Sequence, residues 1–164
     1  MKNWDEQLDL LIRARAPLIW IRSNEEERLE ALLEKVAERL KPRRIATWDY
    51  IEGLKGVINS EGLGSRQPMA VLQWLQKLDS NNPTILLVKD FHRFCEDPGI
   101  ARMLRNLSTE LRQKPHTVVL ASVRHARGLC PFLGRPGQVV GLTVPRARTQ
   151  AIPYGECCGV PGCR

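Results

Sequence analysis

The sequence predicts an α/β protein in which a parallel sheet is covered by helices. Strand-like and helix-like segments alternate through the first 123 residues. The segments 84–88 and 117–121 are continuous apolar runs, which are typical of strands covered on both faces. Segment 24–40 has apolar residues at i, i+3, i+4 and i+7, so it is expected to be an amphipathic helix with one face on the sheet. Alternation of this kind favours a parallel sheet.

Each element has its own local signal. Pro17 separates a first helix from a buried strand, and Ser23, three residues before Glu26, predicts a capping box at the start of the next helix. Pro68 suits a first helical position, and Asp97-Pro98 is a strong helix start. In chain order we expect a helix over 3–14, a strand over 18–22, a helix over 24–40, a strand over 44–48, a loop over 51–65, a helix over 68–79, a strand over 84–88, a helix over 97–111 and a strand over 117–121.

Residues 124–164 differ in character from residues 1–123. They are rich in Gly, Pro, Arg and Cys, and only 138–144 resembles a strand. The change falls where the predicted sheet still lacks a final strand–helix unit. We therefore expect an α/β domain over 1–123 that is incomplete at its C-terminal side. Residues 124–164 form either a genuine, poorly ordered tail or, as we prefer, the frame-shifted end of a longer gene, which the other two reading frames would reveal.

The net charge of +7 belongs mostly to that second part. Residues 124–164 carry six arginines and one glutamate, a net charge of +5, which leaves +2 for the first 123 residues. The charge distribution therefore argues against a folded nucleic-acid-binding face, and only the basic tail favours such a partner. No apolar run approaches the roughly 20 residues that a membrane-spanning helix needs. We expect a cytoplasmic protein with reduced thiols.

The turn after the first strand is where a nucleotide-binding α/β protein carries its phosphate loop. Such a loop needs glycines, a lysine and a hydroxyl, and GxxxxGK[ST] occurs nowhere in the chain. Glu25, Glu26 and Glu27 stand at this place instead. Carboxylates suit the positive end of a helix and repel phosphate there. The sequence therefore argues against nucleotide binding at this turn.

One acid has the position of a catalytic-site residue. Asp90 follows the apolar strand 84–88 as the magnesium-binding aspartate of a Walker B strand would, although Phe91 replaces the glutamate that normally comes next. Asp49 also ends a strand, so an acidic magnesium pocket formed with Asp90 is a minor alternative. The three histidines have no ligand-like spacing, and solvated or core positions are expected for them. The cysteines at 157, 158 and 163 lack the paired spacing of a zinc site, and we expect no metal.

Five segments together resemble a known family, the AAA-type ATPases of cyanobacteria and algal plastids that were first named as a hypothetical chloroplast reading frame. These segments are LDLLIRARAPLIWIRSNEEER, WDYIEGL, PTILLVKDFHRF, DPGIARMLRNL and TVVLAS, within about residues 7–123. The resemblance implies a three-layer, P-loop-NTPase-like parallel sheet that has lost its phosphate loop. It also implies that a second module, beyond these residues, hydrolyses ATP with magnesium. Only Asp90, at the Walker B position, and Ser122, at the position of a polar sensor, carry over as candidate cofactor-binding residues.

The preferred function is that of a non-catalytic interaction or assembly domain, or a truncated fragment, of such an ATPase. We expect protein partners or self-association, no cofactor of its own, and a plastid stroma location if the gene is plastid-encoded. Two alternatives stay open. One is a residual magnesium–nucleotide-binding domain with ATPase activity, and the other is a nucleic-acid-binding module that acts through the basic tail.

Overall fold

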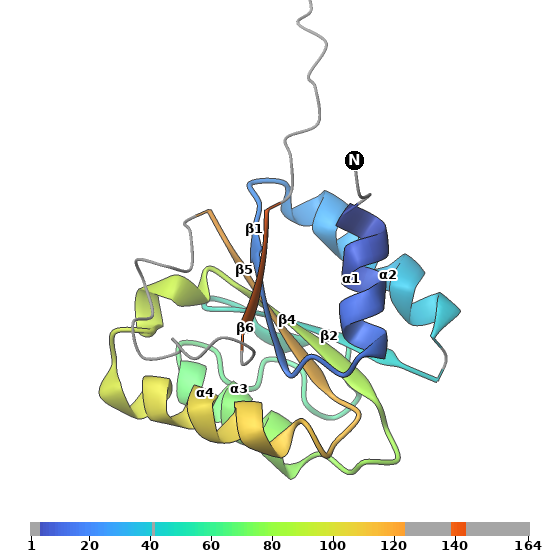
Figure 1. Cartoon of the computed structure of the whole chain (residues 1–164). Helices are drawn as coiled ribbons and strands as arrows, with labels where there is room; N and C mark the ends of the chain where they lie inside the picture. Colours follow the sequence, from blue (N-terminus) through green and yellow to red (C-terminus); the bar gives the residue numbers. More distant parts are fainter. Residues whose placement is uncertain (1–3, 41, 124–138, 144–164) are drawn as a thin grey trace, which may run out of the picture.

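A computed structural model describes residues 4–40, 42–123 and 139–143 of the chain. It shows a mixed α/β domain of three layers, with helices on both faces of one sheet (Figure 1). The elements in chain order are α1 (Trp4–Arg13), β1 (Leu18–Arg22), α2 (Glu26–Arg39), β2 (Arg44–Asp49), β3 (Gly53–Lys55), α3 (Pro68–Lys77), β4 (Thr84–Lys89), the short 3-10 helix η1 (Phe91–Phe94), α4 (Pro98–Glu110), β5 (Thr117–Ser122) and β6 (Val139–Thr143).

The sheet has six strands in the order β3-β2-β4-β5-β1-β6. β3 runs antiparallel to β2, and every other neighbouring pair is parallel. The predicted parallel α/β fold is therefore confirmed. β6 lies within the predicted 138–144 strand and pairs with β1 in the register Leu18↔Val139. The sheet thus gains a parallel strand beyond residue 123, at the segment that resembles a strand in the sequence, while the division of the chain at residue 123 stays a prediction.

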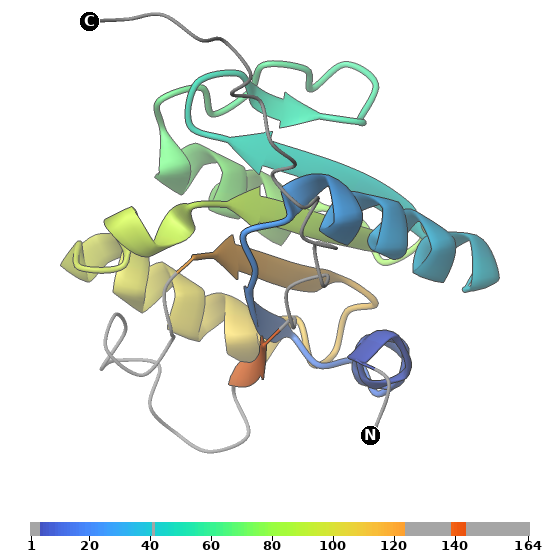
Figure 2. The same ribbon diagram turned by 90° about the horizontal axis from the view of Figure 1, so that it is seen from above.

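Two cores lie on opposite faces of the sheet, because side chains of a strand alternate between faces. Figures 1 and 2 show α1 and α2 on one face and α3 and α4 on the other. In β4, Leu86 and Val88 join the core under α3 and α4, whereas Ile85 and Leu87 join the core under α1 and α2. This burial on both faces explains why the strand reads as a continuous apolar run.

Three tryptophans help to fill the core under α3 and α4. Trp20 and Trp48 are almost completely buried in the core under α3 and α4, and Trp74 packs against it.

Within the described ranges, no helix combines the length and the apolar character that crossing a membrane requires.

Two local predictions need correction. The predicted loop 51–65 contains β3, which is three residues long and has too little apolar pattern to be recognised. The predicted capping box is also wrong: α2 has Glu25 as its N-cap, and the Ser23 hydroxyl accepts a hydrogen bond from the Glu25 N–H at 3.0 Å. The serine therefore closes a short turn before the helix. The start of α4 is confirmed, since Asp97 accepts hydrogen bonds from the N–H groups of Gly99 and Ile100.

Candidate nucleotide site at the carboxyl edge of the sheet

The parallel strands bring their carboxyl ends to one edge, where open α/β sheets bind ligands. β1 ends opposite β5, in the register Arg22↔Ser122, and β4 ends beside β5, in the register Lys89↔Ala121. Asp90, the first residue after β4, donates its N–H to the carbonyl of Ala121 at 3.0 Å. The two predicted site residues, Asp90 and Ser122, therefore lie at the tips of neighbouring strands.

The turn between β1 and α2 holds itself closed with its own hydrogen bonds. The Ser23 N–H donates to the Ser122 carbonyl at 3.0 Å, and the Glu25 N–H donates to the Ser23 hydroxyl. A phosphate loop would instead direct N–H groups of this turn at its ligand. Here two of them are already bonded within the protein.

The surface hollow at this turn is lined by Asn24 and by charged side chains. These are Glu25, Glu26, Glu27 and Arg28. Arg28 does not offset all three acids, because its guanidinium pairs with the Glu25 carboxylate at 2.9 Å. Glu26 has a second cation nearby in Lys89, but Lys89 is shared with Glu30, so carboxylates still outnumber cations here and phosphate would be repelled. The three glutamates that the sequence places at this turn thus line it in the structure.

Lys89, the residue before Asp90, forms ion pairs with two glutamates of α2. Its ammonium lies 2.5 Å from Glu30 and 3.5 Å from Glu26, one helical turn apart on α2. Burial lowers the pKa of Lys89, but the hydrogen bond and charge of Glu30, helped by Glu26, outweigh burial and raise the pKa. Lys89 therefore stays charged and is neutralised by two carboxylates. It fastens the start of α2 to the tip of β4.

Asp90 and Ser122 are linked by a residue that the sequence does not single out. The Ser122 hydroxyl lies 2.9 Å from Nδ1 of His92, and the same nitrogen is 3.8 Å from the Asp90 carboxylate. His92 is buried, as expected for a core histidine. His92 lies in η1, two residues after Asp90, and this turn directs its side chain back towards β5. Only the position of His92 two residues after the strand-end acid could have drawn attention to it.

This Ser–His–Asp group does not have the geometry of a catalytic triad. In a triad the serine and the aspartate contact different ring nitrogens, whereas here both approach Nδ1. Ser122 is only 3% exposed, so a substrate could not reach its hydroxyl. The group instead joins the tips of β4 and β5 in a fixed arrangement.

Asp90 itself is held in an unusual backbone conformation. Its φ of +50° lies in the left-handed region, which aspartate tolerates better than most residues. Its side chain is 58% exposed, so it faces solvent beside the neutralised Lys89. The position that follows is not a catalytic carboxylate but Phe91, which is fully buried and packs edge to face on Trp48 and Phe94. An apolar cluster thus occupies the place of the acid that activates water.

The other candidate groups have local structural roles, although Asp49, which ends β2 parallel to β4, also lies at this edge. The Asp49 carboxylate accepts hydrogen bonds from the N–H groups of Ile51 and Glu52, both at 2.8 Å, and so shapes the turn after β2. His116 lies next to the start of β5, at the opposite edge, and accepts from the Thr84 N–H at 3.2 Å. Among the described residues, no three His, Cys, Asp or Glu side chains are grouped to hold a metal ion. The predictions for His125 and for the cysteines at 157, 158 and 163 lie outside the described residues.

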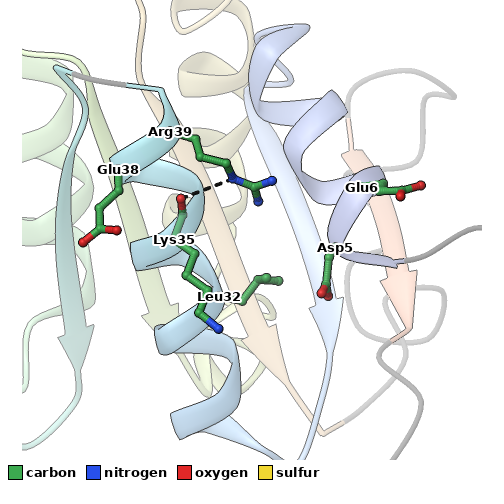
Figure 3. Close-up of a pocket in the computed structure, with 6 residues that line it drawn as sticks. All are labelled: Asp5, Glu6, Leu32, Lys35, Glu38 and Arg39. Atoms are coloured by element: carbon green, nitrogen blue, oxygen red, sulfur yellow. Dashed lines mark hydrogen bonds between the residues drawn. The ribbon is translucent and has the colours of Figure 1, made fainter.

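A second hollow lies between α1 and α2, on a face of the sheet. Figure 3 shows Asp5 and Glu6 on α1 and the other lining residues on α2, with the Glu6 carboxylate directed away from α2 in this view. The residues from α2 are Leu32, Lys35, Glu38 and Arg39. Its lining mixes acidic, basic and apolar side chains and includes none of the predicted site residues.

The fold and this edge together define a class: an α/β domain with the layout of P-loop nucleotide-binding proteins, without the phosphate loop. Comparison with known proteins specifies the family. The family described as "SpoVK-like AAA ATPase, N-terminal domain" matches residues 4–127. The chain therefore belongs to this family, which confirms the resemblance that the five sequence segments predict.

Relatives among curated proteins are larger than this chain. The chain is 36% identical over 118 residues to "Uncharacterized AAA domain-containing protein ycf46" of Trieres chinensis, covering 72% of this chain and 24% of that protein. The protein of the same name from Guillardia theta is 37% identical over 111 residues, covering 68% of this chain and 22% of its own length. The chain thus spans about a quarter of these relatives.

A solved structure supports the fold. The structure described as "Structure of Drosophila ORC bound to DNA" superposes with a TM-score of 0.53, covering 84% of this chain and 42% of that one. The sequence identity is 15%, so this likeness concerns the fold alone.

Proposed function

We propose that this chain, an AAA-type ATPase N-terminal domain by family, is non-catalytic and serves protein interaction or assembly. One observation carries the proposal: the place of the phosphate loop holds three glutamates. The pairing of Lys89, beside Asp90, with Glu26 and Glu30 supports it. Mg-ATP carries a net negative charge, which the three glutamates at the place of the phosphate loop would repel. ATP hydrolysis by the larger relatives would then depend on a different module. A cytosol-like or plastid stroma location fits this role.

ATP turnover by the purified 164-residue chain tests the proposal. We expect phosphate release with ATP and magnesium to equal the protein-free blank. An Asp90→Ala variant purified in parallel is the matched control, because a contaminating ATPase would give the same rate in both preparations. Turnover in the wild type that disappears in Asp90→Ala would overturn the proposal.

Residual magnesium–nucleotide binding is the second candidate, and one observation favours it. Asp90 is solvent-accessible at the tip of β4, as a Walker B acid would be, whereas Ser122 at the tip of β5 is buried against His92. Against it stand the acidic turn and the two bonds that occupy Lys89. A direct nucleotide titration separates the two candidates.

Binding of nucleic acid is the least supported candidate, because it depends on the arginines of residues 124–164. Such binding would come from phosphate contacts and would weaken steeply as salt rises. Replacing the six arginines of 124–164 by glutamine should abolish it, if it occurs at all. Retention of binding by that variant would place a nucleic-acid site on the body of the domain.

A further inference from the structure

Bases gather at the amino edge of the sheet, although residues 1–123 have a net charge of only +2. The connections that lead into β1, β2, β4 and β5 meet at this edge, on the opposite side of the sheet from the candidate nucleotide site. Within the described residues 14–17, 42–44, 78–83 and 111–116, which form it, five bases stand against the single acid Asp79. These bases, here called the cationic edge, are Arg15, Arg43, Arg44, Arg112 and Lys114. The small net charge of the body therefore hides a local excess of positive charge.

The charges of the cationic edge are not neutralised by acids of the described residues. None of the five bases forms an ion pair there. The two that are partly buried bond backbone carbonyls instead: Arg43 donates to Pro115 at 3.2 Å, and the Lys114 ammonium donates to Gln76 at 2.6 Å. A neutral carbonyl holds a cation in place and leaves its charge available to a partner. Arg15, Arg44 and Arg112 are exposed to solvent.

Three of these cations converge on the start of β5 although they come from three separate connections. The Arg43 guanidinium reaches from the start of β2 to the residue before His116. Burial, and then the charge of Arg15, lower the pKa of Arg43. Burial, and then the charges of Lys114 and Arg43, lower the pKa of His116. Like charges thus repel one another across this surface, and an anionic partner would relieve the repulsion.

The end of α1 holds Arg15 at this edge. The Ala16 N–H donates to the Leu11 carbonyl at 3.0 Å, and the Arg15 N–H donates to the Ile12 carbonyl at 3.2 Å. These two bonds form a Schellman motif, in which the residue at the position of Arg15 is usually glycine because its φ is positive. Arg15 has a φ of +56°. An arginine therefore brings its charge to the edge at a position that the backbone alone would give to glycine.

The order of charges along the edge indicates what kind of anion fits. The strands lie in the order β2-β4-β5-β1, so the exposed Asp79, in the connection to β4, interrupts the row between Arg44 and Arg112. A nucleic-acid backbone carries a charge at every repeat and would meet this acid. The described residues of the four connections also hold no Phe, Tyr or Trp on which bases could stack. A protein segment can instead place a neutral or basic residue opposite Asp79, and guanidinium groups match its carboxylates in planar, two-point contacts.

We propose that the cationic edge is the docking surface for a short segment of a partner protein that is rich in Asp and Glu. This inference rests on the proposed interaction role and names its surface and the chemistry of its partner. Three strand spacings separate β2 from β1, roughly 14 Å, which an extended segment of about four residues would span. In the complex Arg15, Arg44 and Arg112 bind carboxylates of that segment. The contact lies away from Asp90 and uses neither nucleotide nor metal.

Fluorescence anisotropy at low ionic strength tests the proposal with a labelled peptide of alternating Glu and Gly as the probe. The protein is the full chain with the six arginines of 124–164 replaced by glutamine, so that only the body contributes positive charge. We expect saturable binding that Arg15→Gln/Arg112→Gln weakens by about fivefold, as the loss of two exposed ion pairs predicts. Arg22→Gln/Arg93→Gln is the matched control, because it removes the same charge from exposed residues at the carboxyl edge and should change the Kd by less than about twofold. Arg44→Gln serves as the second variant in case the first pair fails to fold.

The outcomes separate this proposal from the proposed function. Absence of peptide binding overturns the docking surface, and so does binding that the two double variants weaken equally. Tighter binding of a DNA duplex or of phosphatidylserine vesicles than of the peptide, lost in Arg15→Gln/Arg112→Gln, would assign the edge to a different partner and overturn the proposal. None of these results depends on ATP, whereas turnover lost in Asp90→Ala would overturn the non-catalytic assignment and leave the docking surface standing.

Discussion

Replacing Lys89 by methionine should destabilise the domain, because the Lys89 ammonium joins β4 to α2 through ion pairs with two glutamates. The lysine side chain is 23% exposed and bonds Glu30 at 2.5 Å and Glu26 at 3.5 Å. Hydrogen bonds between charged groups contribute about 1.5–3 kcal/mol when buried, and less with solvent contact. The two carboxylates are 33% and 47% exposed, so we take the lower end, about 1.5 kcal/mol. Without Lys89 the two glutamates, four residues apart on α2, repel each other, which adds roughly 0.3 kcal/mol to the loss of stability.

The assay is thermal and urea unfolding near neutral pH. A loss of about 2 kcal/mol corresponds to a melting temperature lower by roughly 4–8 °C for a protein of this size. Lys55→Met is the matched control, since it removes a Lys–Glu ion pair whose two side chains are both more than half exposed. Such surface pairs contribute little, so we expect its melting temperature to fall by about 1 °C or less.

The pH dependence follows from the sign of the pKa shift. The folded-state pKa of Lys89 is raised, so its stabilising contribution is complete below the unfolded value of about 10.4. The contribution is lost only as pH rises through the folded value, and neutral-pH melts therefore report it in full. If Lys89→Met and Lys55→Met lower the melting temperature equally, or if Lys89→Met is more stable than the wild type, the ion pairs of Lys89 do not stabilise the domain as proposed.

Three further predictions concern single residues. Burial, and then the nearby charges of Lys114 and Arg43, lower the pKa of His116 below its usual value of about 6.5. The contribution of His116 to the free energy of unfolding is therefore complete above about pH 6.5 and declines as pH falls below it, because the unfolded chain binds the proton more readily. Urea unfolding over this pH range should show a smaller decline in His116→Gln than in the wild type. Gly53→Ala should cost about 2 kcal/mol or more, because the glycine has a φ of +76° and a Cβ would lie 2.6 Å from a backbone oxygen; wild-type stability of this variant would contradict the geometry. Asp97→Ala should cost about 1 kcal/mol through loss of the α4 N-cap, seen as a lower urea midpoint with an unchanged slope.

The regular elements could be predicted from the sequence because their signals are local. The run at 84–88 is buried on both faces, and the helical spacing of 24–40 matches the buried face of α2. β3 was not predictable, because its three residues include a glycine and carry no alternating pattern. The prediction of a capping box was wrong because a serine three residues before a glutamate also suits a tighter turn, in which the serine hydroxyl accepts a hydrogen bond from the Glu25 N–H.

The candidate site was predictable only in part. Asp90 and Ser122 could be named because each stands at the end of an apolar run, and the strands do bring their tips together. His92 and the bonds of Lys89 to α2 could not be foreseen. The Ser122–His92 contact joins residues 30 apart in the chain, and the Lys89–Glu30 pair joins β4 to α2. Contacts between distant elements depend on packing, for which a single sequence holds no local pattern.

The central claim is that the carboxyl edge of this domain does not bind nucleotide. Titration of a fluorescent ATP analogue with the wild-type chain, with magnesium and then with a chelator, tests it most directly. The acidic turn and the neutralised Lys89 predict no saturable signal in either condition, and the same flat response for Asp90→Ala. Saturable binding that needs magnesium and is lost in Asp90→Ala would contradict the claim.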